Sequence, residues 1–355
     1  MVTTETRAAQ PQISVIVPAR NEEASLADCL QSLVSQTGVP FEIIVVDDHS
    51  TDRTREIAES FPGVRVIEAG PLPKGWTGKN NAVIAGARAA HGEWLLLTDA
   101  DTVHLPGSLA AALREAQEDG AELLSYSPEQ IAVTFWEIAT LPVVFAELAR
   151  QYSPSSVSDP SSPIAAANGQ YILIRRDTYN AVGGHAAIAG NILEDVALAR
   201  AVKSSGRKIC FRYAADRVRT RMYRNYSQIR DGWTKNLALL FPSPGWLALK
   251  TLLLCALPWI VLFLTLVGVL NPAWDAIVAL DLAWLLIRVN RANFPVKMTL
   301  LATLFGMPMF AHLLLRSKRA HDNGSVTWKG RAYDPKDRVV NEFIRSTPTT
   351  AGRLS

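Results

Sequence analysis

The sequence is poor in cysteine and in net charge, and each shortage excludes a class of protein. Its three cysteines, Cys29, Cys210 and Cys255, are far apart and odd in number, so they fit neither a disulfide framework nor a zinc site. A net charge of +3 over 355 residues gives no support for strong nucleic-acid binding. The first twelve residues lack an apolar run, so we expect no secretory signal and a chain that folds in the cytoplasm.

Charge is also absent from one long stretch near the C-terminus. No charged residue lies between Thr251 and Trp274, and a helix of about 20 residues spans the roughly 30 Å core of a bilayer. This stretch therefore predicts a transmembrane helix. Residues 276–287 and 298–315 are weaker candidates, because Asp281 interrupts the first and the second is of marginal length.

Basic residues restrict how these three segments can be arranged. Lysine and arginine favour the cytoplasmic side of a membrane. They follow both weaker segments, at Arg288, Arg291, Lys297, Arg316, Lys318 and Arg319. Three full spans would place the last group outside, so we expect one of the later segments to be re-entrant or interfacial.

The first two thirds of the sequence alternate short apolar runs with helical patterns. Runs at 13–19, 41–47, 64–69, 95–97, 121–127, 169–177 and 208–214 predict strands, several of them buried on both faces. Helical patterns lie between them, at 21–36, 82–90, 107–119 and 195–205. This alternation predicts right-handed crossovers and an α/β fold with a mostly parallel sheet.

Acidic pairs follow two of these strands. Asp47 and Asp48 end one, and Asp99 and Asp101 end another. Ligands bind at the carboxyl edge of open α/β sheets, so both pairs are expected at one site. Two neighbouring carboxylates repel unless a cation lies between them, and Mg²⁺ or Mn²⁺ carrying substrate phosphates suits such a site. The alternative is that Asp99 caps a turn and Asp101 is solvated.

Three segments, 131–150, 153–163 and 217–235, do not fit the alternation of strands and helices. Residues 131–150 crowd large apolar side chains, and predict either a helix at the membrane interface or acceptor groove, or a buried helix pair broken at Pro142. Residues 153–163 are rich in serine and proline and predict a loop. Residues 217–235 carry six basic residues and predict a cytosolic segment near anionic headgroups, or a solvated basic face.

Five motifs in this order resemble the inverting family 2 glycosyltransferases of GT-A fold. They are VIVPARNEE (15–23), VVDDHSTD (45–52), GWTGKNNA (75–82), TDAD (98–101) and LEDVALARAVKSSG (193–206). The resemblance covers about residues 13–240. QIRDGWTKN (228–236) and VTWKGRAYDP (326–335) look like the membrane-bound branch, which includes hopanoid-associated, carotenoid and ceramide glycosyltransferases.

The resemblance implies how a nucleotide-sugar donor is held. It assigns the nucleoside to Pro18, Ala19, Arg20, Glu22 and an aspartate of the pair Asp47 and Asp48, with Asp48 favoured. Asp99 and Asp101 correspond to the two acids of the family's Asp-x-Asp, and Asp101 is usually the metal ligand. Lys79 is placed to assist on the donor, although it could also be a solvated loop lysine.

The resemblance also implies a base. Inversion is a single in-line displacement, and an acceptor hydroxyl must lose its proton as it attacks. Asp195, next to Glu194, resembles the family's base, although an aspartate before a helix can also serve only as an N-cap. His185, ten residues earlier in a glycine-rich loop, is expected to be an ordinary loop histidine, the alternative being a contact with the acceptor or the sugar.

A partial motif bears on the product. Processive members carry Gln-x-x-Arg-Trp, whereas here Gln228 and Trp233 stand five apart with Arg230 between them. The departure from the pattern puts polymer synthesis in doubt and leaves Trp233 as an expected contact of the donor site.

These inferences predict a membrane-anchored enzyme with four parts. They are a flexible N-terminus (1–12), a GT-A domain (13–245), two or three membrane helices (246–316) and a basic cytosolic tail (317–355). We expect transfer of one sugar, from a UDP-linked donor, to a lipid hydroxyl at the cytoplasmic face of the plasma or inner membrane. Sugar transfer to a polyprenyl phosphate and a non-catalytic scaffold are the alternatives.

Overall fold

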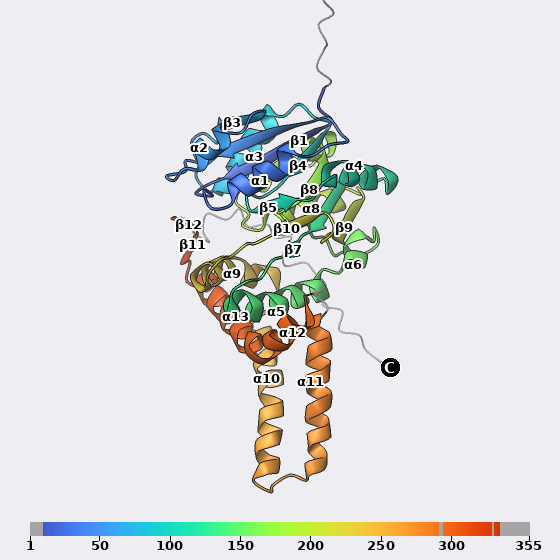
Figure 1. Ribbon diagram of the computed structural model, residues 1–355, viewed down its shortest axis with the longest axis vertical. Helices are drawn as coiled ribbons and strands as arrows, with labels where there is room; N and C mark the ends of the chain where they lie inside the picture. The colour runs from blue at the N-terminus through green and yellow to red at the C-terminus, as the bar shows by residue number, and fades with distance from the viewer. Residues whose placement is uncertain (1–9, 291–293, 329, 334–355) are drawn as a thin grey trace, which may run out of the picture.

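A computed structural model describes residues 10–290, 294–328 and 330–333. Most of the predicted N-terminal segment and of the predicted basic tail therefore lies outside the described residues. Within them, the chain forms a sheet domain, a layer of helices beneath it, and a helical hairpin that projects from that layer (Figure 1).

A seven-stranded sheet forms the centre of the first part. Its order is β3 (Val64–Glu68), β2 (Phe41–Asp47), β1 (Ile13–Ala19), β4 (Trp94–Leu97), β8 (Ile172–Arg175), β6 (Leu123–Ser127) and β9 (Ile209–Tyr213). β8 is antiparallel to both neighbours, whereas the other pairs are parallel. The runs without alternation at β1, β4 and β6 are buried on both faces, as expected for a sheet covered on both sides.

Helices cover both faces of this sheet and make two apolar cores. On one face lie α1 (Leu26–Val34), α2 (Thr54–Glu59) and α4 (Ser108–Glu118). On the other lie α3 (Gly78–Ala89), α7 (Arg176–Ala181) and α8 (Glu194–Ser204). Leu26, Cys29, Leu30 and Leu33 share one side of α1, at helical spacing, and are fully buried. The mixed, mostly parallel sheet with helices on both sides is the predicted α/β fold.

A small second sheet lies at the edge where the acidic pairs are found. Its order is β5 (Thr102–His104), β10 (Val218–Thr220) and β7 (Glu129–Gln130). The sequence pattern did not predict these strands, because two or three residues are too few to show a period. The sheet ties the segment after Asp101 to residues far along the chain.

The helical layer beneath the sheet domain is built on α5 (Phe135–Gln151), α9 (Tyr226–Leu240) and α13 (Met307–Asp322). α5 is one helix through Pro142, not a broken pair, and Thr134 and Glu137 form a complete capping box at its start. Its middle is buried, whereas Phe135 and Trp136 at its first turn are exposed. Segment 131–150 is thus core along most of its length and exposed at one end.

The basic segment 217–235 is not the free basic face that was one of its two interpretations, whereas its position near anionic headgroups stays a prediction. Most of its arginines pair with carboxylates of the protein instead of forming a free basic face. The pairs are Arg217 with Glu115 and Asp216, Arg219 with Glu129, Arg221 with Glu137, and Arg230 with Asp231. A sequence shows the charge of such a segment but not the acids that fold against it. The other irregular segment, 153–163, contains one short helix, α6 (Pro154–Ser158).

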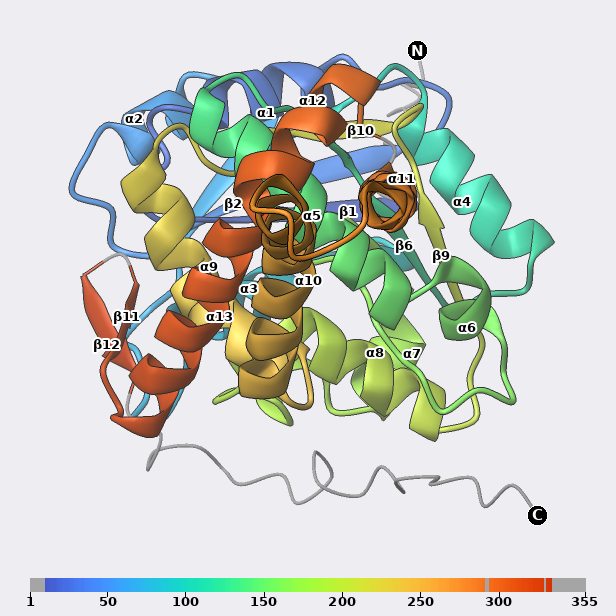
Figure 2. The same ribbon diagram turned by 90° about the horizontal axis from the view of Figure 1, so that it is seen from below.

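Two apolar helices, α10 (Pro244–Leu266) and α11 (Asp275–Asn290), form the projecting hairpin (Figure 1). Figure 2 shows them end-on against the helical layer. α10 begins about seven residues before the charge-free stretch, because Pro244 is favourable at the first position of a helix. It also ends earlier than predicted, at Leu266, and a short turn separates it from η2 (Pro272–Trp274).

The third apolar segment does not project. α12 (Val296–Leu301), the π-helical η3 (Ala302–Gly306) and α13 form one run that packs on α5 and α9, and about half of its most apolar window is buried. By length and composition, α10 and the run Val296–Asp322 could each cross a membrane. A Cβ at Gly306 would lie 2.0 Å from the Ala139 carbonyl oxygen, so η3 and α5 are in backbone contact.

A buried ion pair fixes the hairpin to the layer. The guanidinium of Arg288 on α11 lies 2.5 Å from Glu147 on α5, and both side chains are under a tenth exposed. Arg150 also contacts Glu147, from a more exposed position. The pair joins the hairpin to the longest helix of the layer.

We expect Glu147→Ala to lower the free energy of unfolding by about 3–5 kcal/mol, because it leaves the Arg288 charge buried without its carboxylate. Thermal unfolding of the detergent-solubilised protein measures this loss. The matched control is Glu147→Met with Arg288→Met, which removes both charges and should recover most of the stability. Equal losses in the single and double variants would contradict the assignment.

Candidate active site

A cavity of about 330 Å³ lies between the sheet domain and the helical layer. Its upper wall comes from loops at the carboxyl edge of β1, β2 and β4, and from the segments before β8 and α8. Its lower wall comes from α5 and α9. Charged groups gather along the upper wall, whereas the lower wall is mainly apolar and aromatic: Phe145, Leu148, Ala149, Tyr152, Trp233 and Leu240.

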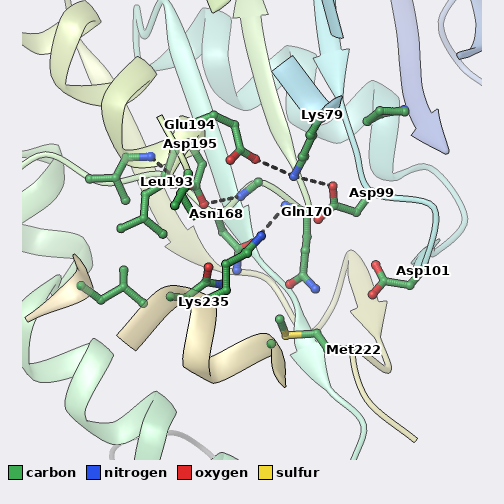
Figure 3. A pocket seen from close by; sticks show the side chains of 18 of the residues that line it. Lys79, Asp99, Asp101, Asn168, Gln170, Leu193, Glu194, Asp195, Met222 and Lys235 are labelled. Atoms are coloured by element: carbon green, nitrogen blue, oxygen red, sulfur yellow. Dashed lines mark hydrogen bonds and ion pairs between the residues drawn. The ribbon is translucent and has the colours of Figure 1, made fainter. Parts of the chain in front are cut away.

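Lys79 joins two of the predicted acids. Its Nζ lies 2.7 Å from Asp99 Oδ1 and 2.7 Å from Glu194 Oε1 (Figure 3). Burial alone would lower the pKa of Lys79, but the two carboxylates outweigh it and hold that pKa well above its usual value. Lys79 is therefore a charged member of the cavity wall and not a solvated loop lysine.

Asp195 is adjacent to Glu194, and the pKa values of the two carboxyls are shifted in opposite directions. Burial and the neighbouring charge of Glu194 raise the pKa of Asp195 to about 6. Lys79 and Lys235 offset the burial of Glu194, whose pKa is lowered. Two adjacent carboxyls with pKa values moved apart are typical of an acid–base site, since one stays ionised while the other can exchange a proton near neutrality.

The geometry of Asp195 is not that of a cap. The N-cap of α8 is Leu193, and Asp195 lies within the first turn. Its Oδ2 accepts a hydrogen bond of 3.0 Å from the Gly169 N–H, and its Oδ1 one of 2.8 Å from the Val196 N–H. These bonds hold the carboxylate at the cavity wall in one orientation (Figure 3).

Asp101 lines the same cavity, from the strand-edge side. Asp99 and Asp101 offer carboxylate oxygens, which Mg²⁺ and Mn²⁺ prefer. Within the described part of the chain, no three acidic, histidine or cysteine side chains converge into a ready-made metal cage. Two carboxylates suit a cation that takes its other ligands from water and from substrate phosphates, so these residues fit the predicted metal.

The two aspartates after β2 have separate positions. Asp48 lines the cavity, together with Pro18, Ala19, Arg20 and Glu22. Asp47 Oδ1 instead accepts a hydrogen bond of 3.2 Å from the Ser50 N–H, within the turn that follows the strand. The geometry favours Asp48 over Asp47 as the group that faces a ligand.

Comparison with known proteins shows what this chain is similar to. Residues 14–180 match the profile of Glycosyl transferase family 2. The chain is 29% identical over 344 residues to 4,4'-diaponeurosporenoate glycosyltransferase of Staphylococcus aureus strain USA300, an alignment that covers 90% of this chain and 88% of the relative. The chain is a glycosyltransferase, and its residues 14–180 match family 2.

The chain is also similar to a relative from a second strain and to a solved structure. The enzyme of the same name from S. aureus strain MRSA252 is 31% identical over 234 residues, covering 64% of this chain and 60% of the relative. A mannosyltransferase from Pyrobaculum calidifontis, solved with GDP-Man and Mn²⁺, superposes with a TM-score of 0.51 at 17% identity, covering 88% of this chain and 87% of its own. At that identity the superposition supports the GT-A fold alone.

The structure also gives the positions of the partial motif and of His185, which the sequence could not place. Trp233 is buried in the cavity wall, where it packs edge-to-face on Phe145 and Tyr223. Gln228 and Arg230, its partners in the partial motif, bond locally instead, to the Arg224 N–H and to Asp231. His185 is buried beside the Tyr179 hydroxyl, 3.1 Å away, and burial lowers its pKa to about 4.

Sequence reasoning missed several residues of the cavity, among them Asn168, Gln170, Lys235 and Arg331. Lys235 was counted within the basic segment, but it reaches the cavity from α9, and burial lowers its pKa. Asn168 and Gln170 precede β8, the antiparallel strand, which begins at the edge where parallel strands end. For Arg331, nothing in the sequence indicates a contact with the N-terminal half.

Proposed function

We propose that this glycosyltransferase moves one sugar from a nucleotide-sugar donor, a UDP-sugar, to the hydroxyl of an apolar lipid at the cytoplasmic face of the membrane, with inversion. One observation carries the proposal: a single cavity joins a charged wall, with Asp195 and the Asp99–Asp101 pair, to an apolar wall from α5 and α9. The charged wall suits a diphosphate and a proton transfer. The apolar wall suits the acceptor.

The proposed reaction is a single displacement. The acceptor oxygen bonds to the anomeric carbon of the sugar while the bond to the nucleoside diphosphate breaks, and Asp195 takes the acceptor's proton. A carboxylate with a pKa near 6 is ionised at neutral pH and is still basic enough for this step. A divalent cation held by Asp101 and Asp99 would neutralise the leaving diphosphate.

The apolar hairpin supports membrane attachment in this proposal. α10 exposes large apolar side chains along its length, among them Leu253, Trp259, Ile260 and Phe263. Contiguous exposed apolar side chains mark interaction with lipid or protein. α11 packs on α5, which also forms the cavity wall, so an acceptor dissolved in the bilayer would have a short path to Asp195.

A second acceptor chemistry has its own support. The name of the staphylococcal relative denotes a carboxylate, diaponeurosporenoate. Lys235 lies where α9 passes from apolar lining to the acid cluster, a place suited to an anionic head on an apolar chain. A carboxylate acceptor is already ionised and needs no base. The same holds for a polyprenyl phosphate.

One experiment tests the function and separates these acceptors. Purified protein in detergent is incubated with radiolabelled UDP-glucose or UDP-GlcNAc, Mn²⁺, and either a long-chain alcohol, a carotenoid acid or a polyprenyl phosphate. We expect label in the lipid phase. Asp195→Asn should lose most of its transfer to the alcohol and should retain its transfer to the two anionic acceptors. Label confined to water-soluble products would contradict the lipid acceptor.

A further inference from the structure

The C-terminal hairpin, β11 (Val326–Trp328) and β12 (Arg331–Tyr333), brings a cation to the nucleoside side of the cavity. Arg331 Nη1 and Nη2 donate to the two oxygens of Asp48, at 2.5 and 3.0 Å. Asp48 is about 5% exposed and Arg331 about 20%. A two-pronged contact between partners 283 residues apart is a specific closure of the cavity by this hairpin.

Gly78 indicates that this closure is built into the fold. It is the first residue of α3, and its φ is not positive, so the backbone does not require glycine there. A Cβ at this position would lie 1.8 Å from Arg331 Nη1 and 2.4 Å from Asp48 Oδ2. Any side chain would therefore occupy the place of the guanidinium. Gly78 leaves the room that Arg331 fills.

Lys79 and Arg331 are cations on different sides of the cavity. Lys79 is engaged by Asp99 and Glu194, on the side of the catalytic acids. Arg331 is on the opposite side, beside the residues that the family resemblance assigns to the nucleoside. A donor's diphosphate brings negative charge between these two places, and the planar guanidinium matches phosphate oxygens as well as it matches a carboxylate.

We propose that Arg331 is a donor-positioning residue: its guanidinium passes from Asp48 to the diphosphate of the incoming nucleotide, and so frees Asp48 to accept a hydrogen bond from the base. The inference rests on the proposed function, because it requires a nucleotide donor in this cavity. The β11–β12 hairpin, which follows the helices α10 and α11 in sequence, would then be part of the donor site.

Calorimetric titration of the full-length protein with UDP, and separately with uridine, tests the exchange. We expect Arg331→Ala to weaken UDP binding about 10- to 100-fold, the usual effect of losing hydrogen bonds from a charged group, and to leave uridine binding within about 3-fold. The donor KM should rise with it, while the acceptor KM stays unchanged. Arg331→Lys should recover part of the affinity.

Two further variants separate positioning from a structural role. Gly78→Ala keeps the arginine but fills its place beside Asp48, and because the guanidinium leaves that place when the nucleotide binds, UDP affinity should not fall. A loss as large as that of Arg331→Ala would contradict the exchange. Arg331→Ala combined with Asp48→Asn removes both charges of the pair. If that double variant regained UDP affinity, Arg331 would only neutralise Asp48 and the inference would be wrong.

The matched control is Lys318→Ala, which removes an exposed cation from the preceding helix that pairs with Asp322. It should bind UDP as the unmodified protein does. Thermal unfolding of each variant shows whether it folds, and Arg331→Lys carries the test if Arg331→Ala does not. Unchanged UDP affinity in folded Arg331→Ala, or in Arg331→Lys where it replaces that variant, would overturn the inference alone. Failure of the unmodified protein to bind UDP or GDP would overturn the proposed function as well.

Discussion

Asp195→Asn is expected to lower kcat with a hydroxyl acceptor by about 10²- to 10⁴-fold, the range that a positioned general base contributes. The amide keeps the size of the side chain and can still accept from the Gly169 or the Val196 N–H, so the fold should survive. Steady-state transfer with a long-chain alcohol measures the loss. Asp231→Asn, a change at a partly exposed aspartate on α9 that pairs with Arg230, is the control and should be near neutral.

The pH profile checks that the loss comes from the base. Because burial and Glu194 raise the pKa of Asp195 to about 6, kcat/KM of the unmodified enzyme should fall with unit slope below about pH 6 and level off above it. Asp195→Asn should lack that limb. An unchanged profile in the variant would assign the titration to another group, and a loss of only a few-fold with alcohols would contradict the base.

Asp101→Asn is expected to reduce transfer about 10²- to 10³-fold, on the scale of removing one preorganised electrostatic contact from a transition state. The change removes a charged oxygen ligand from the place where a cation would meet the leaving diphosphate. EDTA should abolish activity in the unmodified enzyme, and added Mn²⁺ should restore it.

Binding of Mn²⁺ gives a readout that does not depend on turnover. Paramagnetic titration in the presence of UDP should show one site in the unmodified protein and a weaker one in Asp101→Asn. Asp177→Asn, at an exposed aspartate that pairs with Arg175, should match the unmodified protein. Full activity after exhaustive chelation would contradict the metal, and with it the role of Asp101.

The parts of the fold that the sequence predicted are those with a local signal. Buried strands without alternation and acids at their ends identified β1, β2 and β4 and placed Asp48, Asp99 and Asp101 at one edge, because parallel strands share a direction. The family motif around Glu194 and Asp195 added the acids that come to the same cavity. In each case a few adjacent residues carried the information.

The parts that escaped prediction depend on contacts between distant segments. β8 runs against its neighbours, so Asn168 and Gln170 reach the site from before a strand and not after one. The strands β5, β7 and β10 are too short to show a period, and Arg331 acts on a residue near the other end of the chain. Apolar composition alone also could not separate α13, which packs on α9, from α10, which projects.

The Glu147–Arg288 pair has a mechanical consequence. α5 carries Glu147 toward the projecting helices and Phe145 and Leu148 into the cavity. If the hairpin is inserted in lipid as proposed, a thinner bilayer tilts or shifts it to relieve hydrophobic mismatch. A rigid link of this kind would pass that tilt to the wall that receives the acceptor, so lipid chain length would act on this enzyme as an effector of substrate affinity.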